Sequence, residues 1–156
     1  MKKLILFACI FFLAESNFAQ NIRIIKKPEM MDILNKPNSE KVRIVNFWAS
    51  WCAPCVKELP YFKKIAENYS SQVEIIFISL DFAEDIEKAR KILEKKQINW
   101  DSYLLDETKY DTWISDVHKN WQGAIPVTLL ISSKKKMFIE GETNYEDLEK
   151  KIKQLF

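Results

Sequence analysis

Two nearly continuous apolar runs mark buried strands in this 156-residue chain. Residues 42–48 and 73–80 consist largely of aliphatic, β-branched and aromatic side chains, which is typical of strands that are covered on both faces. Shorter segments of the same kind predict the remaining strands, at 22–25, 103–105, 127–131 and 137–139. The last two are expected to form a hairpin, because a short polar stretch separates them.

The segments between these strands repeat apolar residues every three or four positions, which predicts amphipathic helices. The expected helices cover residues 29–36, 52–69, 84–96, 110–121 and 143–155. Capping boxes are expected at Thr108 with Asp111 for the fourth helix, and at Thr143 with Glu146 for the last. Strands and helices alternate until a final strand–strand–helix unit, so the chain predicts an α/β fold with a central mixed sheet and helices on both faces.

Composition excludes several classes of function. The chain carries 24 basic and 22 acidic residues, a near-balance that favours neither nucleic acid nor an anionic membrane surface as a partner. It contains neither a Gly-x-Gly-x-x-Gly motif nor a P-loop, so we expect it to bind no nucleotide of its own. Any electrons that it passes on must therefore come from a partner.

Residues 1–19 have the layout of a secretory signal peptide. Lys2 and Lys3 precede an unbroken apolar run over 4–14, and polar residues then lead to Ala19, after which cleavage is expected. The run is shorter than the roughly 20 residues that span a bilayer, so an uncleaved membrane anchor is the less favoured alternative. Cys9 would be removed with this peptide, which leaves residues 20–156 as one domain.

Cys52 and Cys55 carry the most specific chemistry in the chain, at the point where a buried strand gives way to a helix. A cysteine at a helix N-terminus lies at the positive end of the helix dipole, which favours its thiolate, and a second cysteine one turn later can close a disulfide. Zinc is the competing interpretation, but zinc usually takes four ligands, and His118 is the only histidine. A purely structural disulfide would close a very short loop and stabilise little. We therefore favour redox chemistry without a bound metal.

Residues 46–55, with the sequence NFWASWCAPC, resemble the active-site motif of the thioredoxin superfamily. The next five residues, VKELP, are similar to the secreted TlpA/ResA-type thiol–disulfide oxidoreductases. The sequence IPVT at 125–128 resembles the cis-proline loop of the same family. The resemblance extends over essentially all of residues 20–156, and it implies a thioredoxin-like fold for that domain.

The resemblance also implies roles for individual residues. Cys52 would attack a substrate disulfide, and Cys55 would resolve the mixed disulfide that results. The bond between Ile125 and Pro126 would be cis, so that the Ile125 backbone could pair with an extended substrate segment. The substrate-binding positions that it implies are Trp51, Ala53, Pro54, Ile125 and Pro126.

Two departures from thioredoxins proper concern proton transfer and redox direction. Thioredoxins carry a buried aspartate where this chain has Asn46, which cannot titrate, so the base for Cys55 is unassigned. Glu58 is a candidate because it lies one helical turn beyond Cys55, although ordinary burial preferences favour a solvated glutamate on the helix surface. Ala53 and Pro54 stand where strongly oxidising relatives carry a histidine, which favours a reductant or an enzyme of intermediate potential.

Together these features predict an exported, periplasmic or cell-envelope enzyme that reduces protein disulfides. Its redox-active disulfide, Cys52–Cys55, would be its only cofactor, and a membrane thiol–electron donor would reduce it again. One alternative is a thiol oxidant or isomerase that uses the same residues in the opposite direction. Another is a non-enzymatic carrier of a metal or a thiol, in which the two cysteines serve as ligands.

Overall fold

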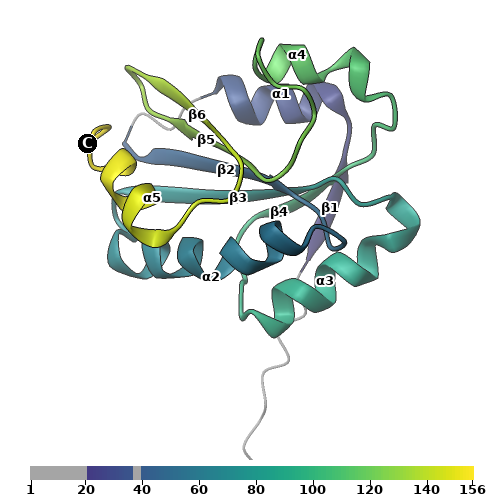
Figure 1. Ribbon diagram of the computed structural model, residues 1–156, viewed down its shortest axis with the longest axis horizontal. Coiled ribbons are helices and arrows are strands. Elements are labelled where there is room, and N and C mark those ends of the chain that lie inside the picture. The colour runs from purple at the N-terminus through teal and green to yellow at the C-terminus, as the bar shows by residue number, and fades with distance from the viewer. Residues whose placement is uncertain (1–20, 37–39) are drawn as a thin grey trace, which may run out of the picture.

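A six-stranded mixed sheet lies at the centre of the computed structural model, which describes residues 21–36 and 40–156 (Figure 1). Its strands are β1 (Ile22–Ile25), β2 (Val42–Trp48), β3 (Val73–Ser79), β4 (Ser102–Leu105), β5 (Val127–Ile131) and β6 (Lys136–Glu140). They follow the spatial order β1-β4-β3-β2-β5-β6, and only the β2–β5 and β5–β6 pairs are antiparallel. The expected signal peptide at 1–19 and residues 37–39 lie outside the described residues.

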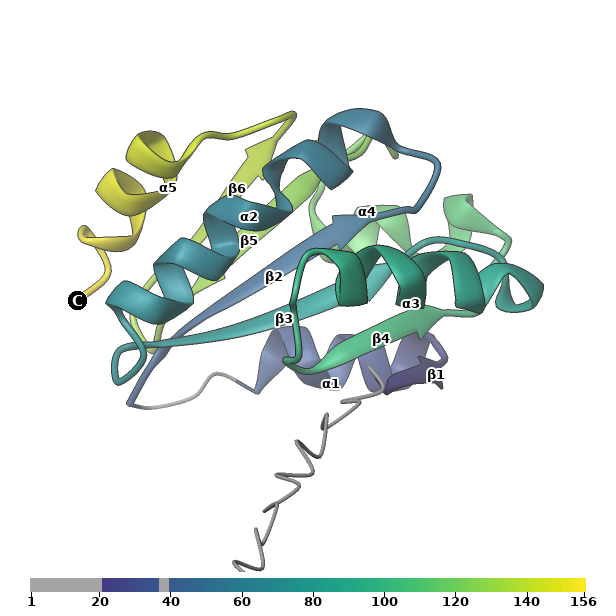
Figure 2. The ribbon, with the colours of Figure 1, turned by 90° about the horizontal axis from the view of Figure 1, so that it is seen from below.

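Helices cover both faces of this sheet (Figure 2). One face carries α2 (Ala53–Asn68), α3 (Ile86–Lys95) and α5 (Tyr145–Ile152), whereas α1 (Lys27–Asn35) and α4 (Ile114–Val117) lie on the other. Alternate residues of β2 supply the two cores: Ile44 packs beneath α2, and Val45 packs on the side of α1. The predicted α/β fold is therefore confirmed. Among the described residues, no helix has the length and apolar character needed to cross a membrane.

The expected helix over 110–121 is wrong as a continuous element. The chain instead forms a short 3-10 helix, η2 (Tyr110–Thr112), then the single turn α4, and it is already extended at His118. Thr108 does not cap η2, because the residue at the N-cap position is Lys109, which makes no side-chain cap bond. Packing explains the break: Trp113 and Trp121 are buried against each other and against Phe47 of β2, and their helical spacing reflects this shared contact rather than a continuous helix.

The N-terminal cap of α5 also lies one residue later than expected. Asn144 is the N-cap, and its side chain accepts a hydrogen bond of 2.8 Å from the backbone N–H of Asp147. The backbone N–H of Thr143 donates instead to Glu58 Oε2, at 2.9 Å. A contact between α2 and the start of α5 has therefore displaced the local capping box that Thr143 and Glu146 predict.

Candidate active site

Cys52 and Cys55 lie where β2 passes into α2. Cys52 is the N-cap of this helix, and its Sγ lies 3.3 Å from the backbone N of Cys55, within hydrogen-bonding distance. The two sulfurs are joined as a disulfide, with the Cα atoms 5.3 Å apart. Pro54 fits in the first turn because its missing N–H would have no partner inside the helix. The predicted cysteine pair is therefore disulfide-bonded at the positive end of a 16-residue helix.

The two cysteines differ in their access to solvent. Cys52 is 6% exposed, at the edge of the surface, whereas Cys55 is completely buried behind it. A group that approaches from solvent can therefore reach the sulfur of Cys52 first.

The loop before β5 reaches the same place from a distant part of the sequence. The Ile125–Pro126 peptide bond is cis, and the carbonyl oxygen of Ile125 lies 3.8 Å from Cys52 Sγ. Pro126 is buried, and Ile125 is half-buried. The pairing of β5 with β2 brings this loop to the cysteines, although more than 70 residues separate them in sequence.

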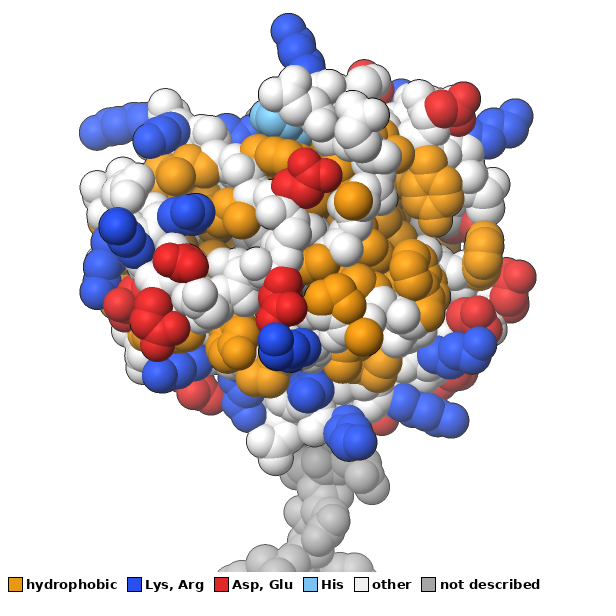
Figure 3. Space-filling view, in the orientation of Figure 1, with side chains coloured by type: hydrophobic (Ala, Val, Ile, Leu, Met, Phe, Trp, Pro, Cys, Tyr) orange, Lys and Arg blue, Asp and Glu red, His pale blue; other side chains and the backbone are white. Residues whose placement is uncertain are grey.

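A surface groove of about 440 Å³ begins beside the disulfide. It is lined by Trp51, Leu80, Tyr110, Ile114, Gln122, Gly123 and Ile125. Trp51 is 64% exposed, and Ala53 and Pro54 are exposed next to it. Figure 3 shows hydrophobic side chains gathered toward the right of one face of the molecule. The structure thus brings Trp51 and Ile125, both predicted, together with Leu80, Tyr110 and Ile114, which no motif in the sequence distinguishes from ordinary core residues.

Glu58 is completely buried. The expectation that it is a solvated glutamate on the helix surface is therefore wrong. Its Oε1 accepts a hydrogen bond of 2.8 Å from Asn46 Nδ2, and its Oε2 accepts the bond from Thr143. Burial disfavours the charged carboxylate and raises the pKa of Glu58 to about 7, although the two hydrogen bonds lower the pKa in part. Glu58 and Cys55 are three residues apart on the buried side of α2, so a titratable group with a pKa near neutrality lies one turn from the buried cysteine.

Asn46 connects this carboxyl group to the sheet. Besides Glu58, its Nδ2 contacts Thr128 Oγ1 of β5 at 3.0 Å. Its Oδ1 is buried and has no hydrogen-bond partner among the described residues. The amide thus holds Glu58 in place, and the sequence-based expectation that position 46 carries no titrating group of its own stands.

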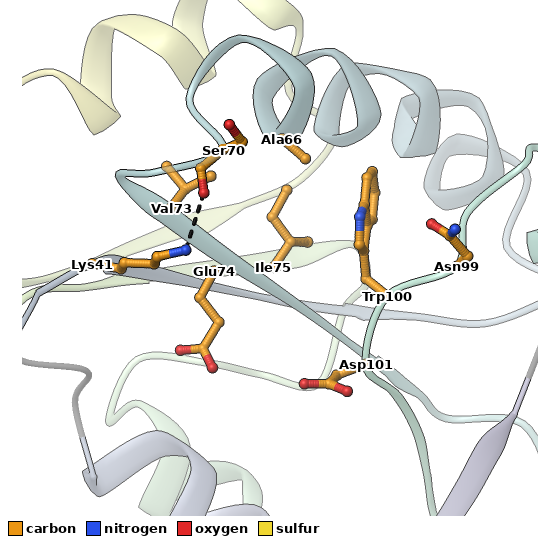
Figure 4. Close-up of a pocket in the computed structure, with 9 residues that line it drawn as sticks. All are labelled: Lys41, Ala66, Ser70, Val73, Glu74, Ile75, Asn99, Trp100 and Asp101. Atoms are coloured by element: carbon orange, nitrogen blue, oxygen red, sulfur yellow. Dashed lines mark hydrogen bonds between the residues drawn. The ribbon is translucent and has the colours of Figure 1, made fainter.

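The other candidate sites of the described chain lie apart from the cysteine pair. In residues 21–36 and 40–156 there is no cluster of three or more His, Cys, Asp or Glu side chains that could hold a metal ion. His118 stacks on Phe138 of β6 with ring centroids 4.0 Å apart. A second pocket, of about 410 Å³, is drawn in Figure 4 and lies between the start of β3 and the segment before β4, where Lys41 Nζ donates to the Ser70 carbonyl. These are the amino ends of the parallel strands, whereas Cys52 follows the carboxyl end of β2.

Residues 39–137 match the family model described as thioredoxin-like. The chain belongs to the thioredoxin-like family. It is 38% identical to a thioredoxin of Coprinus comatus over 82 residues, which cover 49% of this chain and 76% of that protein. It is 45% identical to the thiol–disulfide oxidoreductase ResA of Oceanobacillus iheyensis over 42 residues, which cover only 26% of this chain and 22% of that protein. A thioredoxin-related protein of Neisseria meningitidis has a similar structure, with a TM-score of 0.64 and 26% identity over 78% of this chain and 89% of the other.

These comparisons confirm the predicted fold and the resemblance to ResA-type thiol–disulfide oxidoreductases. The chain matches only part of ResA, so the activity of that whole protein does not transfer with the likeness. What holds for this chain is its membership of a family of thiol–disulfide oxidoreductases and a disulfide-bonded Cys-x-x-Cys pair at the start of α2.

Proposed function

We propose that this protein is an exported enzyme that reduces protein disulfides through Cys52 and Cys55. The observation that carries the proposal is the asymmetry of the pair. Cys52, 6% exposed, is the N-cap of α2 beside the Ile125 carbonyl, and Cys55 is completely buried, one turn from Glu58. A helix N-terminus lowers the pKa of a thiol, and the thiolate is the attacking form.

The first step is the attack of the reduced Cys52 thiolate on a substrate disulfide. A bond forms between Cys52 Sγ and one substrate sulfur, while the other substrate sulfur leaves with the electron pair and takes up a proton. Trp51, Ala53 and Pro54 surround Cys52 on the surface and would contact the substrate chain. The backbone of Ile125, set by Pro126, would pair with an extended segment of that chain.

In the second step Cys55 resolves the mixed disulfide. Its thiol gives its proton to the Glu58 carboxylate, and the resulting thiolate attacks Cys52 Sγ, so that the second substrate sulfur leaves and is protonated. A base whose pKa of about 7 lies close to the operating pH is well matched to a thiol, whose unperturbed pKa is about 8.5. Two electrons pass to the substrate, and Cys52 and Cys55 return to the disulfide form.

Export and re-reduction complete the proposal. The signal-peptide layout of residues 1–19 supports a periplasmic or cell-envelope location. That compartment is kept oxidising, so a reductase there needs a thiol donor, which we place at the membrane. A reduction potential of the purified protein near about −270 mV would support a reductase, whereas a value near about −120 mV would indicate an oxidant.

The decisive experiment traps the mixed disulfide. Cys55→Ser should leave Cys52 able to attack but unable to release its substrate, so that protein adducts accumulate in the cell envelope and disappear on treatment with dithiothreitol. The matched control is Cys52→Ser, which should accumulate none. Adducts in the Cys52→Ser variant, or none in Cys55→Ser, would contradict the assignment of Cys52 as the nucleophile.

A further inference from the structure

Asp81, two residues beyond β3, is a buried carboxylate that the proposed reaction does not use. It is only 2% exposed. Its Oδ2 accepts hydrogen bonds from the backbone N–H of Ser50 at 2.9 Å and from Ser79 Oγ at 2.6 Å, and its Oδ1 accepts one from Ser50 Oγ at 2.5 Å. A buried carboxylate is costly unless hydrogen bonds satisfy it, and two of these three bonds come from one residue, Ser50.

Ser50 belongs to the short turn that carries the nucleophile from β2 into α2. Two backbone bonds also shape this region: Leu80 N–H donates to the Trp48 carbonyl at 2.8 Å, and Cys52 N–H donates to the Ala49 carbonyl at 3.1 Å. Trp51, between Ser50 and Cys52, has a largely exposed side chain, so its packing holds the turn only weakly. The hydrogen bonds from Ser50 to Asp81 are therefore the last side-chain contacts that hold the chain before the nucleophile.

The position of Cys52 matters because the electrostatic effect of a helix terminus falls off within the first turn. Cys52 Sγ is stabilised only while it stays close to the N–H groups of that turn that have no partner inside the helix, such as the Cys55 N–H, which lies 3.3 Å from it. We infer that Asp81 is a positioning residue that, through Ser50, holds Cys52 Sγ at the N-terminus of α2. This inference rests on the proposed role of Cys52.

Charge and positioning act on Cys52 in opposite directions, which makes the inference testable. A nearby negative charge by itself disfavours a thiolate and raises its pKa. The pocket beside Asp81 is lined by three more carboxylates, those of Glu84, Asp106 and Glu107, and by the phenol of Tyr110. Two cations lie nearby: Lys88 is within electrostatic reach of Asp81, and Lys26 pairs with Asp106. If Asp81 acted by charge alone, its removal would lower the pKa of Cys52. If it acts by positioning, its removal raises that pKa.

The test is the pH dependence of alkylation of the reduced, purified protein by iodoacetamide, in which the thiolate displaces iodide. Mass spectrometry of the peptides identifies the alkylated cysteine. We expect the Cys52 midpoint of the unaltered protein to lie below the free-thiol value of about 8.5. Asp81→Ala should raise the midpoint by about one unit, which makes the reaction about tenfold slower at a pH well below both midpoints.

Conservative variants separate hydrogen bonding from charge. Asp81→Asn should leave the midpoint at or below that of the unaltered protein, because its side-chain oxygen can still accept from the Ser50 N–H. Ser50→Ala removes only the hydroxyl bond to Asp81 and should raise the midpoint by less than Asp81→Ala does. Asp85→Asn is the control: this carboxylate lies on the short 3-10 helix η1 (Ala83–Asp85) and pairs with Lys88, so its loss should leave the midpoint unchanged.

An unchanged or lower midpoint in Asp81→Ala would overturn the inference, and so would an Asp81→Asn midpoint as high as that of Asp81→Ala. If Asp81→Ala does not fold, Ser50→Ala decides the matter, since an unchanged midpoint there also overturns the inference. Preferential alkylation of Cys55 in the unaltered protein would contradict the proposed function itself. These failures are therefore distinguishable.

Discussion

Replacing Glu58 with Gln tests whether the buried carboxyl group titrates near neutrality. The pKa of Glu58 in the folded protein is about 7, against 4.5 for the unperturbed group. Because the folded-state pKa is raised, the folded protein holds a proton that the unfolded chain has released between these two values. The free energy of unfolding should therefore decrease as the pH rises from about 4.5 to about 7, and then level off. At about 1.4 kcal/mol per unit, the total decrease is about 3 kcal/mol.

Glu58→Gln should abolish this decrease. A glutamine has the same shape, and its side-chain oxygen can still accept a bond from Thr143 N–H. Its amide N–H can donate to Asn46 Oδ1, which has no partner among the described residues, once the Asn46 amide turns over. We therefore expect the variant to be close to the unaltered protein in stability at pH 5, and more stable than it by about 3 kcal/mol at pH 8.

The assay is urea denaturation of the oxidised protein at pH 5, 6, 7 and 8, because the structure describes the disulfide form. Glu67→Gln is the matched control, since Glu67 is exposed on the same helix and its removal should leave the pH profile unchanged. Parallel profiles for Glu58→Gln and the unaltered protein from pH 5 to 8 would refute the reasoning, because they would mean that Glu58 is already ionised at the lower end of this range.

Two further expectations concern a buried tryptophan and a hydrogen-bonded glutamate. Trp113→Ala should lower the free energy of unfolding by about 3–5 kcal/mol in urea denaturation, because it empties a completely buried site between Phe47 and Trp121. Trp51→Ala is its control and should change stability by about 0.5 kcal/mol at most, because Trp51 is largely exposed. At Glu149, hydrogen bonds from Tyr145 and Tyr69 lower the pKa to about 2, so its contribution to stability is present above about pH 4.5 and is lost as the pH falls toward 2. Thermal unfolding of Glu149→Gln and the unaltered protein should therefore give melting temperatures that differ at pH 7 and converge near pH 2; a constant difference would contradict this.

The features that could be predicted from sequence are those set by neighbouring residues. The strands β2 and β3 can be predicted from their apolar runs, because a strand covered on both faces needs apolar side chains at nearly every position. The redox chemistry of the cysteine pair can be predicted because both thiols lie at the first turn of one helix. The resemblance of residues 125–128 to a cis-proline loop extended the prediction to a segment far from the cysteines in sequence.

The predictions that are wrong or missing concern residues whose surroundings are set by segments distant in sequence. Glu58 looked like a surface residue because the groups that bury it, Asn46 and Thr143, lie 12 and 85 residues away. The aromatic spacing of 110–121 fitted a helix, yet Trp113 and Trp121 are placed by their shared contact with Phe47.

The sequence by itself determined the fold class, the strand before the active site and the two sulfurs that can react, because backbone periodicity and the chemistry of a helix N-terminus depend on residues close together in the chain. Only the tertiary structure decided that Cys55 is buried, that a carboxyl group with a raised pKa lies one helical turn from it and that Asp81 accepts hydrogen bonds from Ser50, two residues before Cys52. Burial and hydrogen bonding depend on which strands become neighbours, and pairing β2 with β3 and β5 is what brings these groups together.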